Sequence, residues 1–237
     1  MNEAPGVSGE AARRLNPRII DTDWLVLTRM QRVIAGLADK LARPGGVALD
    51  FGCGQRPYES LFLARGCRYL GADFEEDSEV RIGADGLLPV ADRSADLVLS
   101  FQVLEHVRDL KTYFSEARRA LADDGLMLLS THGTWLYHPH PEDHRRWTRT
   151  GLVAEIENHG FEVLETHPVV GPLAWTTMIR LTCISFALRK APLVGRPFSA
   201  LVAWLMNLKA LVEECITPKW VTADNACVYV VLCRRKG

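Results

Sequence analysis

Apolar residues recur at helical spacing near the start of the chain and then change to short runs that are typical of buried strands. Residues 21–42 carry apolar side chains three or four positions apart, from Trp24 to Leu41, and Pro44-Gly45-Gly46 ends this pattern. Beyond it, short apolar runs alternate with helical segments, which predicts a parallel α/β sheet with helices on both faces. The expected strands cover 47–50, 68–73, 80–84, 95–100, 126–131, 161–167 and 226–233, and the expected helices lie near 58–64, 109–121 and 149–159.

Three segments fall outside this alternation. Residues 1–20 lack periodicity, so we expect a flexible arm ahead of one domain that spans 21–237. Residues 131–148 follow the fifth expected strand and concentrate histidine and tryptophan, which is typical of a functional loop. Residues 171–218 form an apolar insertion before the last strand, with helical patterning on both sides of two prolines.

The composition excludes several classes of protein. In 237 residues, 48% are hydrophobic and 24% are charged, as in ordinary globular domains. The net charge of -1 and the lack of a basic stripe argue against a nucleic-acid partner. Six cysteines without a C-x-x-C pair, and no secretory leader, favour reduced thiols and a cytoplasmic location. The most apolar stretch, 173–188, is interrupted by Arg180 and is shorter than the roughly 20 residues that span a bilayer, so we expect no transmembrane segment.

A buried strand ends in an acid and turns through two glycines. The strand that begins at Val47 carries Asp50 at its end, and the chain then turns through Gly52 and Gly54. The absence of side chains at these glycines lets a flat, nucleotide-like ligand approach the backbone. Glycines also serve tight strand-to-helix turns, so this pattern alone leaves a purely structural interpretation open.

Two further acids follow at strand ends. Asp73 comes about 20 residues after the glycine turn, the usual place for an acid that binds ribose hydroxyls. Asp85 leaves the short strand in the segment GADGLLP and could accept the amino group of adenine. Either acid alone could be an ordinary surface side chain, but together with Asp50 they indicate a site for an adenosine.

Four blocks carry a family resemblance. In order, LDFGCG, GADF, ADGLLPVADRSADLVLSFQVLEHV and EARRALADDGLMLLST resemble the class I S-adenosylmethionine-dependent methyltransferases of the broad type 11 family, over residues 47–161. The resemblance implies a Rossmann-like sheet of seven strands, mostly parallel, with the last strand antiparallel beside the fifth. It implies that S-adenosylmethionine lies across the strand ends, held at Asp50, Gly52, Gly54, Asp73, Phe74, Asp85, Gly86, Phe101 and Gln102.

One position departs from the family pattern. Arg56 stands where the family often has a third glycine, and the resulting GCGxxPY turn is similar to that of a subgroup associated with glycan and natural-product methylation. A nicotinamide fingerprint would require glycine at Pro57, which weighs against the alternative of an NAD-dependent oxidoreductase.

The loop after the fifth strand supplies candidate bases. Its sequence HPHPEDHRRWT resembles the H..P.D..R.T block of the same subgroup, and we favour His144 as a general base, with His138 and His140 behind it. An equally good interpretation is that Asp143 braces the turn while Arg145 or Arg146 pairs with a carboxylate. The spacing of the histidines and acids in this loop does not match zinc patterns, so we expect no metal. The resemblance implies that Glu105-His106 begins a helix near the cofactor.

The sequence therefore predicts a methyltransferase for a small-molecule or glycan acceptor, with transfer to oxygen favoured. The alternative outside enzymology is a non-catalytic cofactor-binding subunit that acts through a partner. The insertion, over 172–216, is expected to pack on the sheet or in a homodimer. Alternatively it forms a lid for a lipid-linked acceptor, with Arg189, Lys190 and Arg196 meeting a charged head group at a membrane surface.

Overall fold

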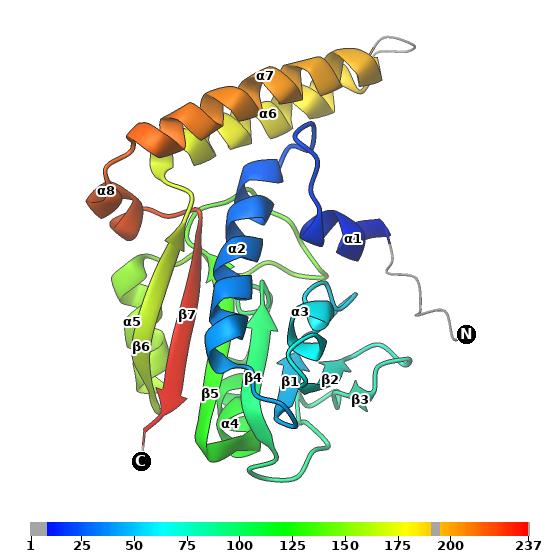
Figure 1. The fold of residues 1–237 in the computed structure, drawn as a ribbon, viewed down its shortest axis with the longest axis vertical. Coiled ribbons are helices and arrows are strands. Elements are labelled where there is room, and N and C mark those ends of the chain that lie inside the picture. The colour runs from blue at the N-terminus through cyan, green and yellow to red at the C-terminus, as the bar shows by residue number, and fades with distance from the viewer. Residues whose placement is uncertain (1–8, 191–194, 237) are drawn as a thin grey trace.

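The computed structural model describes residues 9–190 and 195–236, and its centre is a seven-stranded sheet (Figure 1). The strand order is β3-β2-β1-β4-β5-β7-β6, and β7 runs antiparallel to both of its neighbours while the other pairs are parallel. This confirms the expected α/β class and the insertion of the last strand beside the fifth. The strands are β1 Val47–Phe51, β2 Arg68–Asp73, β3 Val80–Arg81, β4 Ala95–Phe101, β5 Leu121–His132, β6 Phe161–Val169 and β7 Val228–Arg235.

Helices cover both faces of the sheet because the strands bury side chains on both sides. In β7, Val228, Val230 and Leu232 enter one apolar core, while the alternate residues Tyr229 and Val231 enter the other. The helices that cover the first face are α2 Trp24–Leu41 and α3 Glu59–Leu63, and those on the second face are α4 Leu110–Ala120 and α5 Arg149–Asn158.

Part of the expected arm over 1–20 is helical, and residues 1–8 lie outside the described residues. Gly9–Leu15 forms helix α1, in which Ala11 is fully buried. The Arg13 guanidinium donates to both carboxylate oxygens of Asp23, at 2.6 and 2.7 Å, which ties this helix to the start of α2. Contacts between segments therefore order a stretch whose local sequence has no periodicity.

Three local features of the secondary structure also differ from expectation. The third strand ends at Arg81 rather than at residue 84, because Gly83–Gly86 forms a turn closed by the Gly86 N–H on the Gly83 carbonyl. Helix α8, Lys219–Asp224, was not predicted. Glu105 and His106 lie in a turn, and the following helix starts at Leu110, where the Asp109 side chain accepts two backbone N–H groups as its cap.

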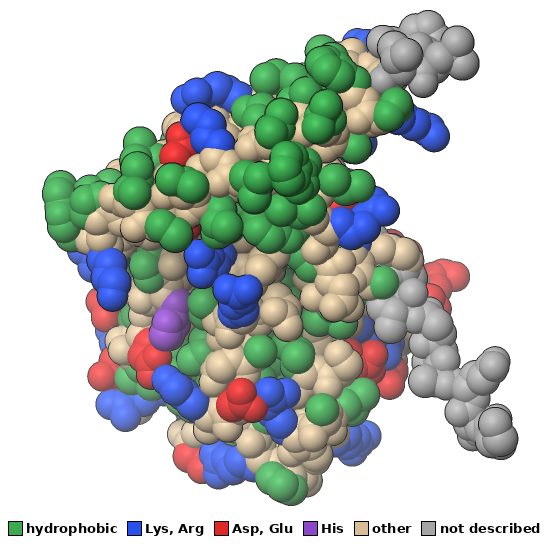
Figure 2. Space-filling view, turned by 45° about the horizontal axis from the view of Figure 1, so that its top comes forward, with side chains coloured by type: hydrophobic (Ala, Val, Ile, Leu, Met, Phe, Trp, Pro, Cys, Tyr) green, Lys and Arg blue, Asp and Glu red, His purple; other side chains and the backbone are tan. Residues whose placement is uncertain are grey.

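The insertion forms a helical hairpin of α6 Pro172–Leu188 and α7 Gly195–Ile216. It lies across the end of the molecule at which β4 and β6 finish (Figure 1). Apolar side chains gather along its outer surface (Figure 2). No helix among the described residues is long and apolar enough to cross a membrane.

Candidate functional site

The turn after β1 has an open side. Gly52 and Gly54 have φ values of +83° and +48°, which favour glycine. A Cβ on Gly52 would lie 2.7 Å from a methyl group of Val103, so packing also requires glycine there. A Cβ on Gly54 would meet no atom within 4 Å. The backbone at Gly54 is thus free to be approached by a ligand, whereas Gly52 packs against Val103, which follows β4.

Asp73 joins the end of β2 to the glycine turn. One carboxylate oxygen accepts the Gly54 N–H at 2.7 Å, and the other accepts the Phe74 N–H at 2.7 Å. A carboxylate has about four acceptor sites, so both oxygens retain lone pairs for ribose hydroxyls. The Phe74 side chain beside it is 59% exposed and offers an apolar surface at the same strand end.

Asp50 is buried beneath the turn with an unmet hydrogen-bonding atom. The Tyr69 hydroxyl donates to Oδ2, whereas Oδ1 has no partner among the described residues. Burial raises the pKa of the Asp50 carboxyl to about 7. An ammonium group placed beside it would supply the missing donor and favour its charged form. This atom therefore fits the amino group of the methionine part of S-adenosylmethionine.

The remaining predicted cofactor residues surround the same edge of the sheet. Asp85 and Gly86 lie on the turn after β3, where an Asp85 oxygen accepts the Leu87 N–H at 3.1 Å. Gln102 follows β4 with a φ of +58°, and its side-chain amide donates to the Ser130 hydroxyl at 3.1 Å. The Phe101 ring packs in the core at 5.0 Å from the Tyr58 ring, so only its backbone is available at the strand end.

Arg56 explains how the turn tolerates the loss of the third glycine. It has a φ of +52°, the left-handed conformation that glycine adopts without strain. Its guanidinium lies 3.6 Å from a carboxylate oxygen of Glu79 and 3.9 Å from one of Glu59. The far end of the turn thus keeps a glycine-like backbone, stabilised by these two acids.

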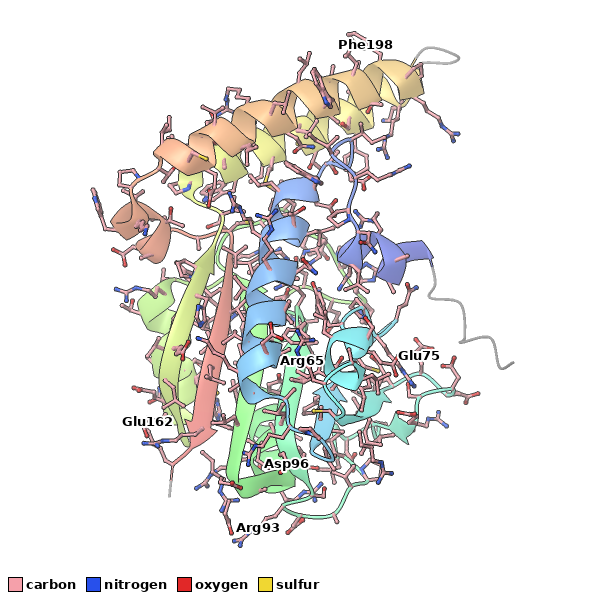
Figure 3. All side chains as sticks on the ribbon, in the orientation of Figure 1. Arg65, Glu75, Arg93, Asp96, Glu162 and Phe198 are labelled. Atoms are coloured by element: carbon pink, nitrogen blue, oxygen red, sulfur yellow. The ribbon has the colours of Figure 1, made fainter. Side chains whose placement is uncertain are left out.

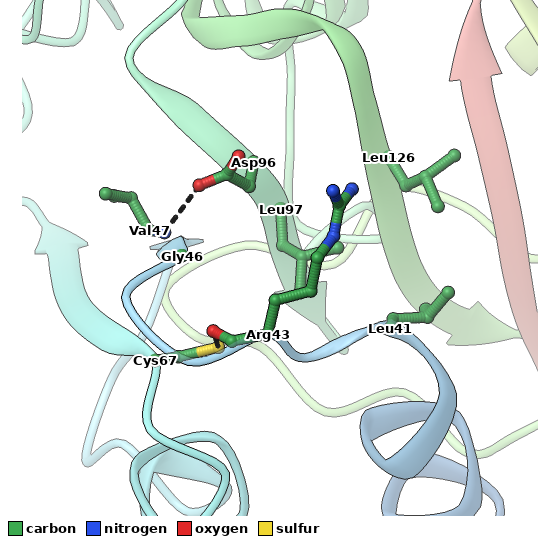
Figure 4. Close-up of a pocket in the computed structure, with 8 residues that line it drawn as sticks. All are labelled: Leu41, Arg43, Gly46, Val47, Cys67, Asp96, Leu97 and Leu126. Carbon is green, nitrogen blue, oxygen red and sulfur yellow. Dashed lines mark hydrogen bonds between the residues drawn. The ribbon is translucent and has the colours of Figure 1, made fainter.

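A small pocket at the other end of the sheet is structural. Asp96 lies at the end away from α7 (Figure 3) and accepts the Val47 N–H at 2.7 Å. The pocket beside it, between Arg43 and Leu126, has a volume of about 10 Å³, enough for roughly one water (Figure 4). It lies at the amino-terminal ends of β1 and β4, opposite the glycine turn.

An ion pair shapes the loop after β5. Arg146 donates to both oxygens of Asp143, at 2.5 and 2.6 Å, and also to the Leu136 carbonyl at 2.7 Å. Asp143 also accepts the His138 N–H at 2.9 Å. The hydrogen bonds from Arg146 hold the pKa of Asp143 well below its usual range. Of the two arginines that the bracing interpretation offered, Arg146 is the one that pairs with Asp143.

The structure brings only part of the predicted histidine set together. The His138 ring lies 4.8 Å from the ring of His132 and 5.1 Å from that of His106. The His140 ring is at the exposed margin, 6.3 Å from that of His106. His144 is exposed, and its Nε2 lies 3.1 Å from a carboxylate oxygen of Glu142. Its backbone N–H donates to the Glu105 carbonyl at 2.8 Å, which fixes this part of the loop to the turn after β4.

The sequence did not single out Glu105 and His132 as partners. Glu105 is fully buried, and one of its oxygens accepts the Thr131 hydroxyl at 2.9 Å. Burial raises its pKa to about 7 and lowers the pKa of His132 well below its usual value, so His132 is neutral at pH 7. The available signal in the sequence was position. Glu105 follows the apolar strand β4 and His132 ends β5, both at the same end of the sheet as the glycine turn.

Comparisons with known proteins point the same way. The sequence profile of a methyltransferase domain matches residues 26–166. A probable S-adenosylmethionine-dependent methyltransferase from Mycolicibacterium smegmatis is 30% identical over 182 residues, which is 70% of each chain. One from Mycobacterium tuberculosis is 28% identical over 102 residues, 38% of this chain and 37% of its own.

Solved structures share the fold at low identity. The 1,6-didemethyltoxoflavin-N1-methyltransferase of Burkholderia thailandensis, with its substrate and S-adenosylhomocysteine bound, superposes with a TM-score of 0.56 and 17% identity, covering 100% of this chain and 94% of that one. A methyltransferase in complex with the Trm112 activator of Haloferax volcanii gives a TM-score of 0.56 at 16% identity, covering 97% of this chain and 98% of that one.

Proposed function

Because the chain belongs to the S-adenosylmethionine-dependent methyltransferases, we propose that it methylates an oxygen atom of a small-molecule or glycan acceptor bound over the ends of β4 and β5. S-adenosylmethionine supplies the methyl group as an electrophile on its sulfonium. We propose that the catalytic domain spans residues 21–237. We place it in the cytoplasm, which is supported by six free cysteines, four of them buried as thiols.

The proposed cofactor contacts follow the strand ends. Asp50 would accept from the ammonium, Asp73 from the ribose hydroxyls and Asp85 from the adenine amino group. Gly54 offers its open backbone to the methionine part. Phe74 supplies an exposed apolar surface beside the ribose acid. The rest of the cofactor site would be lined by Gly52, Gly86, Phe101 and Gln102.

The observation that carries the proposal is the gathering of imidazole groups beside the glycine turn. Val103 contacts Gly52, and the turn that follows Val103 bears His106, whose Nδ1 lies 2.6 Å from the Glu142 carbonyl in the loop after β5. Methyl transfer to a hydroxyl requires alignment and acceptance of one proton. Neutral imidazole accepts such protons near pH 7.

Among the loop histidines, we propose His144 as the proton acceptor. Its side chain is partly exposed and lies beside the Glu142 carboxylate, which would orient the ring. Its backbone is fixed to Glu105. His138 and His140 stay in the proposal as residues that shape the acceptor site.

Substitution of His144 by glutamine is expected to lower turnover by about 100-fold, because general-base catalysis contributes at least roughly that factor. The dissociation constant for S-adenosylmethionine, measured by calorimetry, should stay within about twofold. His167→Gln is the matched control, since His167 is also paired with a glutamate, Glu165 at 2.8 Å, but lies on β6. Wild-type turnover in the His144 variant would assign this residue a structural role.

The acceptor is tested by incubating the protein with methyl-labelled S-adenosylmethionine and a panel of sugars, phenols and amines. We expect label on a hydroxyl oxygen, located by NMR. Label on an amine nitrogen would contradict the oxygen acceptor. Cofactor binding without transfer to any compound of a host extract would favour the non-catalytic subunit.

We also propose that the α6–α7 hairpin rests on a membrane surface. On α7, the residues that face the protein are small or polar, such as Ser199, Ala203 and Asn207. The large apolar residues face outward at helical spacing, the reverse of an ordinary surface helix. These exposed residues are Phe198, Leu201, Trp204, Leu205, Leu208, Val212 and Ile216.

The charges of the hairpin favour an anionic surface over a second copy of the chain. Its basic residues Arg180, Arg189, Lys190 and Arg196 are exposed, whereas Lys209, also exposed, is paired with Glu213. Its two acids are half-buried and satisfied internally, with Glu214 accepting the Gly171 N–H at 2.7 Å and Glu213 accepting the Thr177 hydroxyl at 2.6 Å. Each basic residue near an anionic membrane adds about 1 kcal/mol of attraction.

Flotation with lipid vesicles tests this docking. The protein should float with vesicles that contain anionic lipid and far less with neutral vesicles, while the double variant Leu201→Ser/Leu205→Ser should stay at the bottom. Leu63→Ser is the control, because Leu63 is 50% exposed on α3. Equal flotation of the double variant would contradict the membrane proposal. The membrane proposal would also be contradicted if light scattering showed a dimer, and the same two substitutions dissociated this dimer but left flotation unchanged.

A further inference from the structure

Three side chains with metal-binding groups meet where β4 and β5 end. Glu105 comes from the turn after β4, His132 closes β5, and His138 comes from the following loop. Each offers one oxygen or nitrogen atom, and these three atoms lie within 4.8 Å of one another. Val103, two residues before Glu105, packs against Gly52 of the glycine turn. The cluster therefore borders the proposed methyl-transfer site.

Two buried atoms of this cluster have no hydrogen-bond partner among the described residues. They are Oε1 of Glu105, a residue with no exposed surface, and Nδ1 of His132, which is 7% exposed. The interior of a protein rarely leaves a carboxylate oxygen and an imidazole nitrogen unpaired, since each loses its hydration without compensation. The unpaired oxygen of Glu105 therefore points to a ligand that accepts an electron pair. The His132 atom that faces this oxygen is Nε2, the other nitrogen of the same ring.

The spacing fits metal ligands better than a direct hydrogen bond. Oε1 of Glu105 lies 3.6 Å from Nε2 of His132, beyond the range of an N–H···O hydrogen bond. Two ligands at about 2.1 Å from a tetrahedral zinc ion stand about 3.4 Å apart. The existing separation of this pair needs little adjustment to hold a cation between its members.

Neighbouring groups orient all three side chains. The Thr131 hydroxyl donates to the other oxygen of Glu105 at 2.9 Å, which leaves Oε1 directed at the cluster. Nδ1 of His138 lies 3.2 Å from the Leu136 carbonyl and 3.3 Å from an oxygen of Asp143, which leaves Nε2 for a metal. Arg146, the nearby cation, is neutralised by its paired contact with Asp143.

We propose that Glu105, His132 and His138 bind one divalent transition-metal ion of the zinc or manganese type. Two imidazoles and one carboxylate suit these ions, and three protein ligands leave a position for a further oxygen. That position would hold the acceptor, a role that rests on the proposed function. This site replaces the expectation of no metal: His132 and His138 lie in the 131–148 loop, and the third ligand, Glu105, comes from the turn after β4. Of the other loop residues, Asp143 is engaged by Arg146 and His144 by Glu142.

The test is metal binding by the full chain, without acceptor or turnover. Protein stripped with a chelator is titrated with Zn²⁺ by calorimetry and with Co²⁺ by visible absorption, at neutral pH. We expect one equivalent, and at least about a 100-fold loss of affinity in Glu105→Gln and in His138→Gln. His138 lies in the loop, so its variant keeps the test valid if the buried Glu105 variant unfolds. His140→Gln should bind as the wild type does.

Failure of this inference is distinguishable from failure of the proposed function. No bound equivalent in the wild type, or unchanged affinity in both ligand variants, would overturn the metal site whatever the catalytic result. An equal loss in His140→Gln would also overturn the assignment, because it would place the ion in the outer loop. Affinity for S-adenosylmethionine, measured on the same samples, should stay within about twofold in every variant.

Discussion

Replacing Asp73 by alanine is expected to abolish measurable binding of S-adenosylmethionine, with a loss of affinity of at least about 100-fold. The carboxylate accepts the Gly54 and Phe74 N–H groups, so it shapes the glycine turn. In the proposed binding mode it also accepts from the ribose hydroxyls. Hydrogen bonds to a charged group contribute about 1.5–3 kcal/mol each. Loss of two such bonds to ribose hydroxyls accounts for a factor of 100 or more, and loosening of the turn adds to it.

Calorimetry with S-adenosylmethionine measures this effect, and urea unfolding reports whether the fold survives. Glu75→Ala is the control, since Glu75 is an exposed acid two positions further on and its side chain points away from the sheet (Figure 3). We expect this control to bind as the wild type does. Unchanged affinity in Asp73→Ala would contradict the placement of the cofactor at the ends of β1 and β2.

The fold was predictable because the strand signal is local. The run Val228–Cys233 is apolar at every position, since β7 lies between two strands and packs against helices on both faces. The direction of β7 within the sheet could not be predicted from the residues of the strand itself. The antiparallel placement beside β5 came only from the family resemblance, because periodicity does not encode which neighbour a strand pairs with.

The candidate site was predictable where a residue acts through its own strand end. Asp73 and Gly54, separated by 19 positions, are joined by one hydrogen bond that the strand-end rule anticipates. No such rule brings together Glu105 and His132, which lie 27 positions apart on two different elements. The family resemblance placed Glu105 at the start of a helix, whereas Glu105 lies in a turn and α4 begins only at Leu110, after its cap at Asp109.

Loss of the Asp143 side chain is expected to be the most damaging change in the loop after β5. Asp143→Ala removes the acceptor of the His138 N–H and leaves the Arg146 guanidinium without its carboxylate partner. Because the Asp143 side chain is only 2% exposed, we expect destabilisation of about 2–3 kcal/mol, above the 0–1 kcal/mol of an exposed ion pair.

Turnover of the Asp143→Ala variant should fall by at least about 100-fold, because displacement of the loop by about 1 Å is enough to misalign an acceptor. Affinity for S-adenosylmethionine should change by less than about threefold, since the proposed cofactor contacts lie at the ends of β1, β2 and β4 and on the turn after β3. Glu162→Ala is the matched control, because Glu162 pairs with Arg234 at 2.8 Å on the exposed edge of β6 (Figure 3). Equal effects of the two substitutions on turnover and on the urea midpoint would show that the Asp143–Arg146 pair does not hold the loop in its active shape. A parallel loss of cofactor affinity would place the loop in the cofactor site instead.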